Sequence, residues 1–272
     1  MFNARLATAL ILLAAFVAAA LVLPNRWWAA LLLIGLAVAG WEWGALAGSG
    51  RMRRALLVGV LVISASAIGL SAGSSLESDT GARTVETAVY GASMAFWLLL
   101  AAPWLAQRWQ IRSRLALEGA GWIVLVPTWL ALARMQSEPG TLLALLGIIW
   151  IADTAAYVSG KTWGRHLLAP RISPAKTWEG VAGACAAVAV YYGALSMLAP
   201  EWRWVHGWSG VVLFAGITLM SIVGDLYESW MKRQAGVKDS GALLPGHGGL
   251  LDRIDSMCSS MPFAALLLHQ FR

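Results

Sequence analysis

The sequence has few charged residues and few cysteines. Only 12% of its 272 residues are charged, about half of the roughly 25% found in soluble domains. This excludes a water-soluble globular protein, a disordered chain and a nucleic-acid binder with a basic surface. The two cysteines, Cys185 and Cys258, exclude a disulfide scaffold, a cysteine-rich zinc site and an iron–sulfur site. In contrast, 59% of the residues are hydrophobic and the mean hydropathy is +0.67.

Long apolar segments predict an all-α integral membrane protein. A spanning helix needs about 20 mostly apolar residues. The expected spans, about nine in number, are 6–23, 27–47, 55–72, 88–106, 119–135, 141–159, 178–199, 208–227 and 256–270. We expect the first span to be an uncleaved helix rather than a signal peptide, because a second span follows almost at once. We divide the chain into segments 1–87, 88–160 and 161–272, each containing three spans.

The distribution of basic residues predicts how the chain is oriented. If the N-terminus is cytoplasmic, 15 of the 20 Lys and Arg residues fall in cytoplasmic segments and 5 in outer ones. Cytoplasmic loops are normally the ones enriched in Lys and Arg. The sequence therefore predicts an N-in, C-out topology. The loops after the sixth and eighth spans then lie together on the cytoplasmic side, where we expect a polar cavity.

Polar residues concentrate in the stretch 225–255, which holds 5 of the 14 acidic residues. Asp225 ends an apolar helix, and Asp252 and Asp255 share a face if the ninth span begins there. Such carboxylates can bind Mg²⁺, which prefers oxygen ligands. Basic residues in the same stretch suit phosphate oxygens: Lys232, Arg233, Lys238 and Arg253. The glycine-rich turn at 245–249 allows backbone N–H groups to approach an anion.

A second polar cluster spans residues 153–179. Asp153 lies inside the sixth span, where a charge is costly and indicates a functional site, and Lys161 follows it at helical spacing. Ser173, Lys176 and Thr177 bring hydroxyls and an ammonium to the start of the seventh span. Ser173 also fits the role of N-cap of that helix, and a helix N-terminus favours phosphate as well.

Several of these residues also have ordinary structural explanations. Lys232 and Arg233 by themselves are typical of a cytoplasmic flank. Asp239 alone fits a solvated loop charge, and His247 alone is more often structural than catalytic. Glu42, between two tryptophans in the second span, fits a satisfied buried carboxyl group or a subunit contact, and we expect no catalytic role for it. Together, however, the residues of 225–255 are hard to explain by packing alone.

This stretch resembles the signature of the phosphatidate cytidylyltransferases, also called CDP-diacylglycerol synthases. The matching residues are Ser229, Met231, Lys232, Arg233, Lys238, Asp239, Gly241, Leu244, Pro245, His247, Gly248, Gly249, Leu250, Asp252, Arg253, Ile254 and Asp255. The segment 173–180 is also similar to the family, although Ala175 stands where many members carry Lys. The resemblance is strongest over 150–256, while the first 140 residues are generic membrane sequence.

The resemblance implies an enzyme that converts phosphatidic acid and CTP to CDP-diacylglycerol and pyrophosphate, in phospholipid biosynthesis. It implies an integral protein of a bacterial-type inner membrane with its active site facing the cytoplasm. It further implies a homodimer, and Mg²⁺ as cofactor with K⁺ as a candidate second cation. Its partners would be CTP, phosphatidic acid and membrane lipid, without nucleic acid. Segment 161–272 would then contain the catalytic helices and loops.

We assign roles to the individual residues on this basis. In the family, aspartates like Asp225 and Asp252 hold the metal ions, and Asp255 and Asp239 are supporting candidates. The basic residues Lys232, Arg233, Lys238 and Arg253 would neutralise the triphosphate or the lipid phosphate. His247, Gly248 and Gly249 would shape the nucleotide loop. The remaining substrate-binding candidates are Asp153, Lys161, Ser173, Lys176, Thr177 and Ser229.

Other functions stay open at this point. A CTP-dependent membrane lipid kinase would transfer the γ-phosphate and release CDP. A cytidylyltransferase acting on another lipid phosphate would share the same signature. An ion-coupled transporter with Asp153 and Asp225 in its pathway is less well supported, because transporters commonly show internal repeats with broken helices and the chain has no convincing repeat. A non-enzymatic scaffold leaves the clustering of Asp and Lys unexplained.

Overall fold

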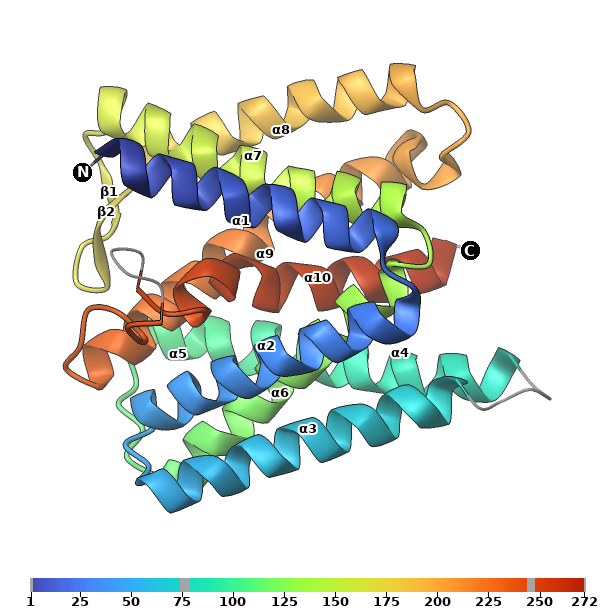
Figure 1. The fold of residues 1–272 in the computed structure, drawn as a ribbon. Coiled ribbons are helices and arrows are strands. Elements are labelled where there is room, and N and C mark those ends of the chain that lie inside the picture. Colours follow the sequence, from blue (N-terminus) through green and yellow to red (C-terminus); the bar gives the residue numbers. More distant parts are fainter. Residues whose placement is uncertain (1, 74–78, 244–247, 272) are drawn as a thin grey trace.

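A computed structural model of the chain describes residues 2–73, 79–243 and 248–271. These residues fold into a bundle of helices whose axes run roughly alongside one another (Figure 1). The elements are α1 (Phe2–Val22), α2 (Asn25–Leu46), α3 (Arg51–Gly73), α4 (Asp79–Ala95), the π-helix η1 (Phe96–Ala101), α5 (Ala102–Gln107), α6 (Arg114–Met135), α7 (Pro139–Trp163), β1 (Leu167–Ala169), β2 (Ser173–Thr177), α8 (Trp178–Leu198), the 3₁₀-helix η2 (Arg203–Val205), α9 (Gly207–Gln234) and α10 (Leu251–Phe271).

Seven helices in the described part of the chain are long and apolar enough to cross a membrane. They are Asn25–Leu46, Arg51–Ser71, Arg83–Gln107, Arg114–Met135, Pro139–Trp163, Trp178–Leu198 and Gly207–Gln234. Neither α1, of which Ile11–Val22 is a shorter apolar helix, nor α10 is among them. The prediction of an all-α integral membrane protein is confirmed in this coarser form, and the count of nine spans stays a prediction.

A short β-hairpin interrupts the helices between α7 and α8. Strands β1 and β2 pair antiparallel, with Leu167 opposite Thr177 and Ala169 opposite Ser173. The prediction that Ser173 caps the following helix is therefore wrong, since strand pairing holds Ser173 four residues before the N-cap position. Thr177 is the N-cap instead: its backbone is extended and its Oγ1 accepts a hydrogen bond of 3.1 Å from the Gly180 N–H.

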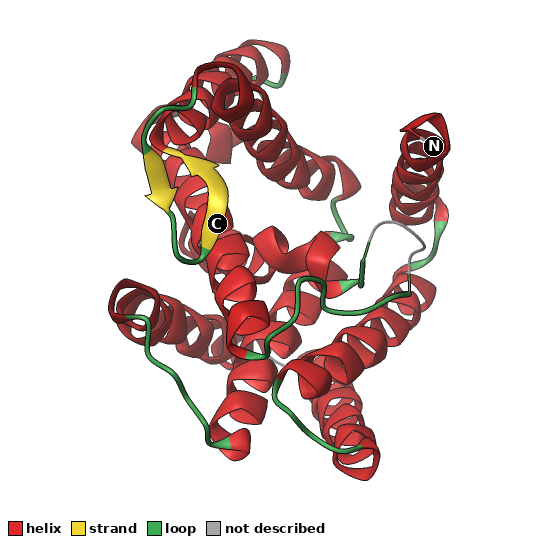
Figure 2. Ribbon diagram, turned by 90° about the vertical axis from the view of Figure 1, so that its left-hand side faces the viewer, coloured by secondary structure: helices red, strands yellow, loops and turns green. Residues whose placement is uncertain are grey.

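The hairpin marks one end of the bundle, which we call the hairpin end. The end of α9 and the start of α10 lie at this end with the N-terminus, and the C-terminus lies at the opposite end (Figure 1). Figure 2 looks onto the hairpin end, with the strands in yellow. The described parts of the loops after the sixth and eighth predicted spans therefore lie at the same end of the bundle, as expected. Arg233 of α9 bonds directly to the hairpin, donating from Nε to the Ile172 carbonyl at 3.3 Å.

Aromatic packing around Tyr227 fixes the position of α9 in the bundle. Tyr227 is buried, and its ring contacts Trp43 of α2, Phe96 and Trp97 of η1, and Trp104 of α5 at centroid distances of 5.3–6.2 Å. Aromatic pairs at such distances stabilise beyond the apolar area they bury. Helices from the N-terminal half of the chain thus hold the helix that carries Asp225.

Small residues set how closely the helices of this core approach one another. A Cβ placed on Gly121 of α6 would lie 2.5 Å from Nε1 of Trp43, whereas one placed on Gly119 would meet nothing within 4 Å. Trp43 cannot easily move, because its Nε1 donates a 2.7 Å hydrogen bond to the Leu117 carbonyl. The contact between α2 and α6 therefore depends on a glycine at position 121.

We expect Gly121→Ala to destabilise the protein by about 1–3 kcal/mol, the usual cost of overpacking a core. The matched control is Gly119→Ala on the same helix, which should be neutral or slightly stabilising, because Ala favours helix over Gly by up to about 1 kcal/mol. Thermal unfolding of both variants in detergent measures the difference. Equal melting temperatures for the two variants would contradict the tight packing of α2 on α6.

Candidate functional site

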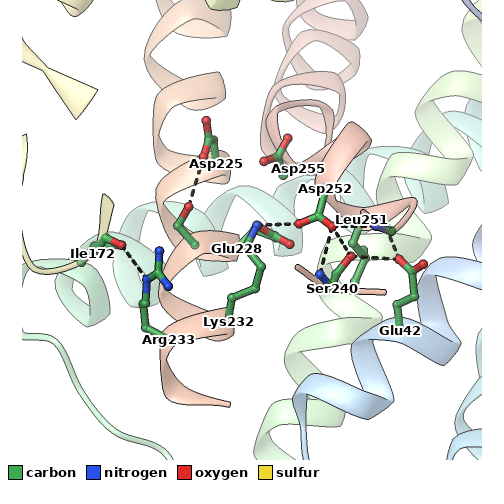
Figure 3. A network of polar contacts seen from close by, with 12 residues as sticks. Glu42, Ile172, Asp225, Glu228, Lys232, Arg233, Ser240, Leu251, Asp252 and Asp255 are labelled. Atoms are coloured by element: carbon green, nitrogen blue, oxygen red, sulfur yellow. Dashed lines mark hydrogen bonds and ion pairs between the residues drawn. The ribbon is translucent and has the colours of Figure 1, made fainter. Parts of the chain in front are cut away.

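The junction of α9 and α10 brings two of the predicted aspartates face to face. A Cβ on Gly224 would lie 2.5 Å from the Asp255 carbonyl oxygen, so only glycine permits this close approach of the two helices. Asp225, the next residue along α9, and Asp255 of α10 then point into the same space (Figure 3). As expected, Asp252 and Asp255 both lie in the first turns of a helix, α10, whereas the assignment of this helix as a ninth span stays a prediction.

Asp225 is bound by residues of both predicted clusters. The ammonium of Lys176, on strand β2, forms an ion pair with Asp225 Oδ2, and Ser229 Oγ, one turn further along α9, lies 3.4 Å from Oδ1. Both side chains of the ion pair are only about one quarter exposed, at 24% and 29%. Lys176 of the hairpin thus pairs with Asp225, which was predicted from the sequence to be a metal ligand.

Lys232 lies between two carboxylates at the same junction. Its Nζ forms an ion pair with Glu228, one turn earlier on α9, and lies 2.6 Å from Asp252 Oδ1 (Figure 3). The Glu228 side chain is 4% exposed, and its Oε1 has no hydrogen-bond partner among the described residues. Two carboxylates share one ammonium, so this pocket carries an excess of negative charge when all three groups are ionised.

The second oxygen of Asp252 accepts hydrogen bonds from the loop that precedes α10. Its Oδ2 accepts hydrogen bonds from the backbone N–H of Ser240 at 3.0 Å, from Ser240 Oγ at 2.9 Å and from the Gly249 N–H at 2.7 Å. Burial by itself would raise the pKa of Asp252, but the Lys232 ammonium and the two N–H groups outweigh burial and lower it to about 2. Asp252 is therefore a carboxylate throughout the physiological range of pH.

Gly248 shows why this loop needs glycine. Its φ is +81°, a conformation that other residues rarely adopt, and a Cβ there would lie 2.5 Å from Asp252 Oδ2. A side chain would therefore be strained by its backbone and would also collide with the carboxylate. The prediction that Gly248 and Gly249 shape a nucleotide-binding loop stays a prediction. His247 lies outside the described residues.

The residues of the second cluster adjoin this junction from α7 and the hairpin. Ser256 Oγ of α10 lies 3.5 Å from Asp153 Oδ1 of α7, which ties a third aspartate to the α10 start. Thr177 is buried as the cap of α8, whereas Ser173 is half-buried in β2. Lys161 is exposed and lies over the ring of Tyr157, with its Nζ 5.6 Å from the ring centroid.

Three of the predicted charged residues are exposed to solvent. Lys238 and Asp239 lie exposed in the loop after α9, and Arg253 is exposed on α10. Arg233 binds the Ile172 carbonyl, as described above, and so joins α9 to the hairpin rather than to an aspartate. The structure thus brings together Asp153, Lys176, Asp225, Ser229, Lys232, Gly248, Gly249, Asp252 and Asp255. Asp239 adjoins this group, because a Cβ on Gly248 would lie 3.5 Å from Asp239 Cβ.

The predicted metal ligands do not converge on one point. Within the described ranges, no three His, Cys, Asp or Glu residues are close enough to hold a metal ion together. Asp225 is paired with Lys176 and Asp252 with Lys232. The chemistry of the donors nevertheless fits a hard divalent cation, which takes carboxylate oxygens, and Glu228 Oε1 is a buried carboxylate oxygen without a hydrogen bond among the described residues.

Two residues of the site were not identified from the sequence. Glu42 of α2 accepts hydrogen bonds from the loop before α10, and Ser240 Oγ lies within hydrogen-bond distance of both Glu42 and Asp252, donating its single proton to one of them at a time. A carboxylate inside an apolar span is a signal of function, and it was present at Glu42. Nothing comparable marks Ser240, because a serine beside a glycine is ordinary in any loop.

These features define an integral membrane protein with a site of paired acidic and basic side chains at one end of its helix bundle. The chain belongs to the cytidylyltransferase family, whose sequence profile matches residues 3–271. It is 38% identical over 280 residues to the phosphatidate cytidylyltransferase of Pseudomonas aeruginosa, covering 98% of this chain and 97% of that protein. The resemblance of the signature is therefore confirmed by a match over nearly the whole chain.

Two further similar proteins carry the same name, phosphatidate cytidylyltransferase. The phosphatidate cytidylyltransferase of Haemophilus influenzae is 32% identical over 289 residues, which cover 97% of both chains. That of Brucella suis is 47% identical over 132 residues, which cover 48% of this chain and 46% of the relative. The full-length matches show that the similarity extends through the N-terminal helices as well as the signature.

We expect Lys232→Met to destabilise the protein by about 3–5 kcal/mol, because it leaves Glu228 and Asp252 as neighbouring buried carboxylates without their cation. Adding Glu228→Gln to Lys232→Met should recover part of the loss, since one of the two charges is then removed. Thermal unfolding in detergent measures both effects. A matched control is Lys161→Met, which removes an exposed lysine. If Lys232→Met is no less stable than Lys161→Met, the charge pairing at the junction is unimportant for stability.

Proposed function

We propose that the chain transfers CMP from CTP to phosphatidic acid, giving CDP-diacylglycerol and pyrophosphate. The observation that carries this proposal is the end-to-end similarity to a relative named phosphatidate cytidylyltransferase, at 38% identity over 98% of the chain. The contacts at the α9–α10 junction support it, because acidic and basic residues of the signature meet there. An enzyme of this kind needs both: cations for phosphate oxygens and carboxylates for a metal ion.

The nucleophile in this reaction needs little activation. The second pKa of a phosphate monoester is near 6, so the lipid phosphate is largely a dianion at pH 7. One of its oxygens forms a bond to the α-phosphorus of CTP, and the bond from that phosphorus to the bridging oxygen of pyrophosphate breaks. A strong general base is unnecessary, which argues against such a role for His247. Catalysis then depends on positioning and on neutralising charge.

Carboxylates of the junction would hold the divalent cation on which this chemistry relies. We assign Asp225, Asp252 and Asp255 as ligands of Mg²⁺, with Asp239 in support and K⁺ as a candidate second cation. When bound, Mg²⁺ would neutralise charge between the attacking and the leaving oxygens. Lys176 and Lys232 already neutralise Asp225 and Asp252 in the structure, so the protein itself stabilises these carboxylates.

Basic and hydroxyl groups would bind the two substrates. We assign Lys232, Arg233, Lys238 and Arg253 to the phosphate oxygens of CTP or of the lipid. Phosphate favours positive side chains and backbone N–H groups at helix starts. The binding of the headgroup or the triphosphate would further use Asp153, Lys161, Ser173, Lys176, Thr177, Ser229, Gly248 and Gly249.

The substrates also determine where the reaction takes place. A two-tailed lipid stays in the bilayer and a triphosphate stays in water, so the site must lie at the interface and open to both. We propose that the hairpin end faces the cytoplasm, with the N-terminus inside, the C-terminus outside and the protein in the bacterial inner membrane.

We also propose that the protein is a homodimer. Within each chain we propose a division at residues 87 and 160, with the catalytic segment following residue 160.

Measuring the products of CTP distinguishes this function from its nearest rival. The purified protein in detergent should release pyrophosphate from CTP only with phosphatidic acid and Mg²⁺, with CMP joined to the lipid, and EDTA should stop the reaction. Release of CDP would instead indicate a CTP-dependent lipid kinase. Turnover only with another lipid phosphate would indicate a different acceptor. Either result would overturn the proposed function.

We expect Asp225→Asn and Asp252→Asn each to lower kcat at least 100-fold, because each removes a negative ligand from the site while keeping its shape. The control is Glu201→Gln, an exposed carboxylate in the loop before η2 at the opposite end. Pyrophosphate release at saturating Mg²⁺ gives the rates, and membrane fractionation checks insertion. Near-normal turnover by either aspartate variant would remove that residue from the proposed ligands.

A further inference from the structure

Glu42 is a carboxylate in the apolar helix α2, far from the signature in sequence. Its residue exposure is 6%, and its neighbours along the helix are Trp41 and Trp43. Its oxygens nevertheless accept three hydrogen bonds from the signature loop: from the Leu250 N–H at 3.0 Å, the Leu251 N–H at 2.9 Å and Ser240 Oγ at 3.2 Å (Figure 3). All three donors thus come from residues about 200 positions away.

Two of these hydrogen bonds cap the helix that carries Asp252 and Asp255. The first N–H groups of a helix have no partner within it, and α10 begins at Leu251. Glu42 binds the N–H groups of Leu250 and Leu251, so it caps α10 from another helix. A negative charge at this position is also favoured by the helix dipole.

The third hydrogen bond joins Glu42 to the same serine that binds Asp252. Ser240 Oγ lies 3.2 Å from Glu42 Oε2 and 2.9 Å from Asp252 Oδ2. The Ser240 side chain therefore lies between a carboxylate of α2 and a carboxylate of α10. A shift of either carboxylate would change the position of the other through this hydroxyl.

The loop encloses Glu42 so tightly that a side chain at either of two signature glycines would displace its carboxylate. A Cβ on Gly241 would lie 2.5 Å from Glu42 Oε1, and one on Gly249 would lie 2.5 Å from Oε2. These glycines stand on either side of the segment 244–247. The described parts of the loop therefore enclose the carboxylate from both sides. The contacts of Glu42 are thus specific rather than incidental.

We propose that Glu42 is a positioning residue for cytidylyl transfer, anchoring the signature loop and the start of α10 so that Asp252 is held in its working position. The proposal rests on the proposed function. Among the described residues, no hydrogen bond joins Glu42 to Asp252 directly, and Glu42 acts through Ser240 and the backbone N–H groups of Leu250 and Leu251. The second helix thereby becomes part of the active site, although its sequence looks like that of an ordinary membrane span.

Glu42→Gln tests this proposal while keeping the side-chain size. The amide has one acceptor oxygen instead of two, and its NH₂ group faces N–H donors, so at least one loop donor loses its partner. We expect kcat for pyrophosphate release to fall at least tenfold, with the KM for CTP changed less than threefold. The matched control is Glu118→Gln, which removes a carboxylate that pairs with Arg53 and Ser49 on other elements. It should retain its rate.

Hydrogen exchange measured by mass spectrometry provides a readout that does not depend on activity. In Glu42→Gln, peptides containing residues 240–251 should exchange at least tenfold faster than in the wild type, whereas peptides from α6 and α7 should be unchanged. A purely structural role would instead speed exchange across the bundle and lower the melting temperature without changing kcat of the folded fraction. That pattern, or unchanged exchange and kcat, would overturn the proposal.

Glu42→Asp covers the case in which Glu42→Gln does not insert into the membrane. It keeps the charge but shortens the side chain by one methylene, so the carboxylate cannot reach all three donors. We expect a folded protein with a kcat reduced severalfold, and a normal kcat would overturn the proposal. The wild type separates the two hypotheses: if it releases no pyrophosphate, the proposed function fails, whereas an active wild type with an equally active Glu42→Gln defeats only the positioning role.

Discussion

A carboxylate withdrawn from water must find its hydrogen-bond donors within the protein, and Asp252 shows how the site depends on this constraint. One of its oxygens binds Lys232 of α9, and the other binds Ser240 and the Gly249 N–H. These partners come from the preceding helix and from both sides of the loop. The arrangement of α9, the loop and α10 around each other follows from satisfying this one charge.

The α9–α10 junction contains both ion pairs that stabilise the fold and carboxylates that can bind a cation. Gly224 lets α9 and α10 approach so closely that Asp225 and Asp255 share a space, and Glu228 lies nearby on α9 (Figure 3). Crowded carboxylates repel one another and are costly to bury without cations. Lys232 from the helix and Lys176 from the hairpin provide them. An excess of carboxylate oxygen over ammonium is also what a hard metal ion requires.

The N-terminal helices contribute more to the site than their generic sequence indicates. Trp43 of α2 packs on Tyr227 of α9, and Glu42, its neighbour in sequence, binds the loop before α10. Adjacent residues of one helix point to different faces, because successive residues turn by about 100°. One position of α2 therefore holds the helix of Asp225, while the next holds the helix of Asp252 and Asp255.

Local sequence determined the membrane character of this protein, because hydropathy over about 20 residues is enough to define a spanning helix. It also determined the residues of the signature, since clustered aspartates and lysines stand out against an apolar background. Only the tertiary structure decided their pairing: Lys176 with Asp225, Lys232 with Asp252, and Glu42 with a loop some 200 residues away. It also decided that Thr177, not Ser173, caps α8. Hydrogen bonds act over about 3 Å in space, and a linear sequence does not show which distant residues the fold brings within that distance.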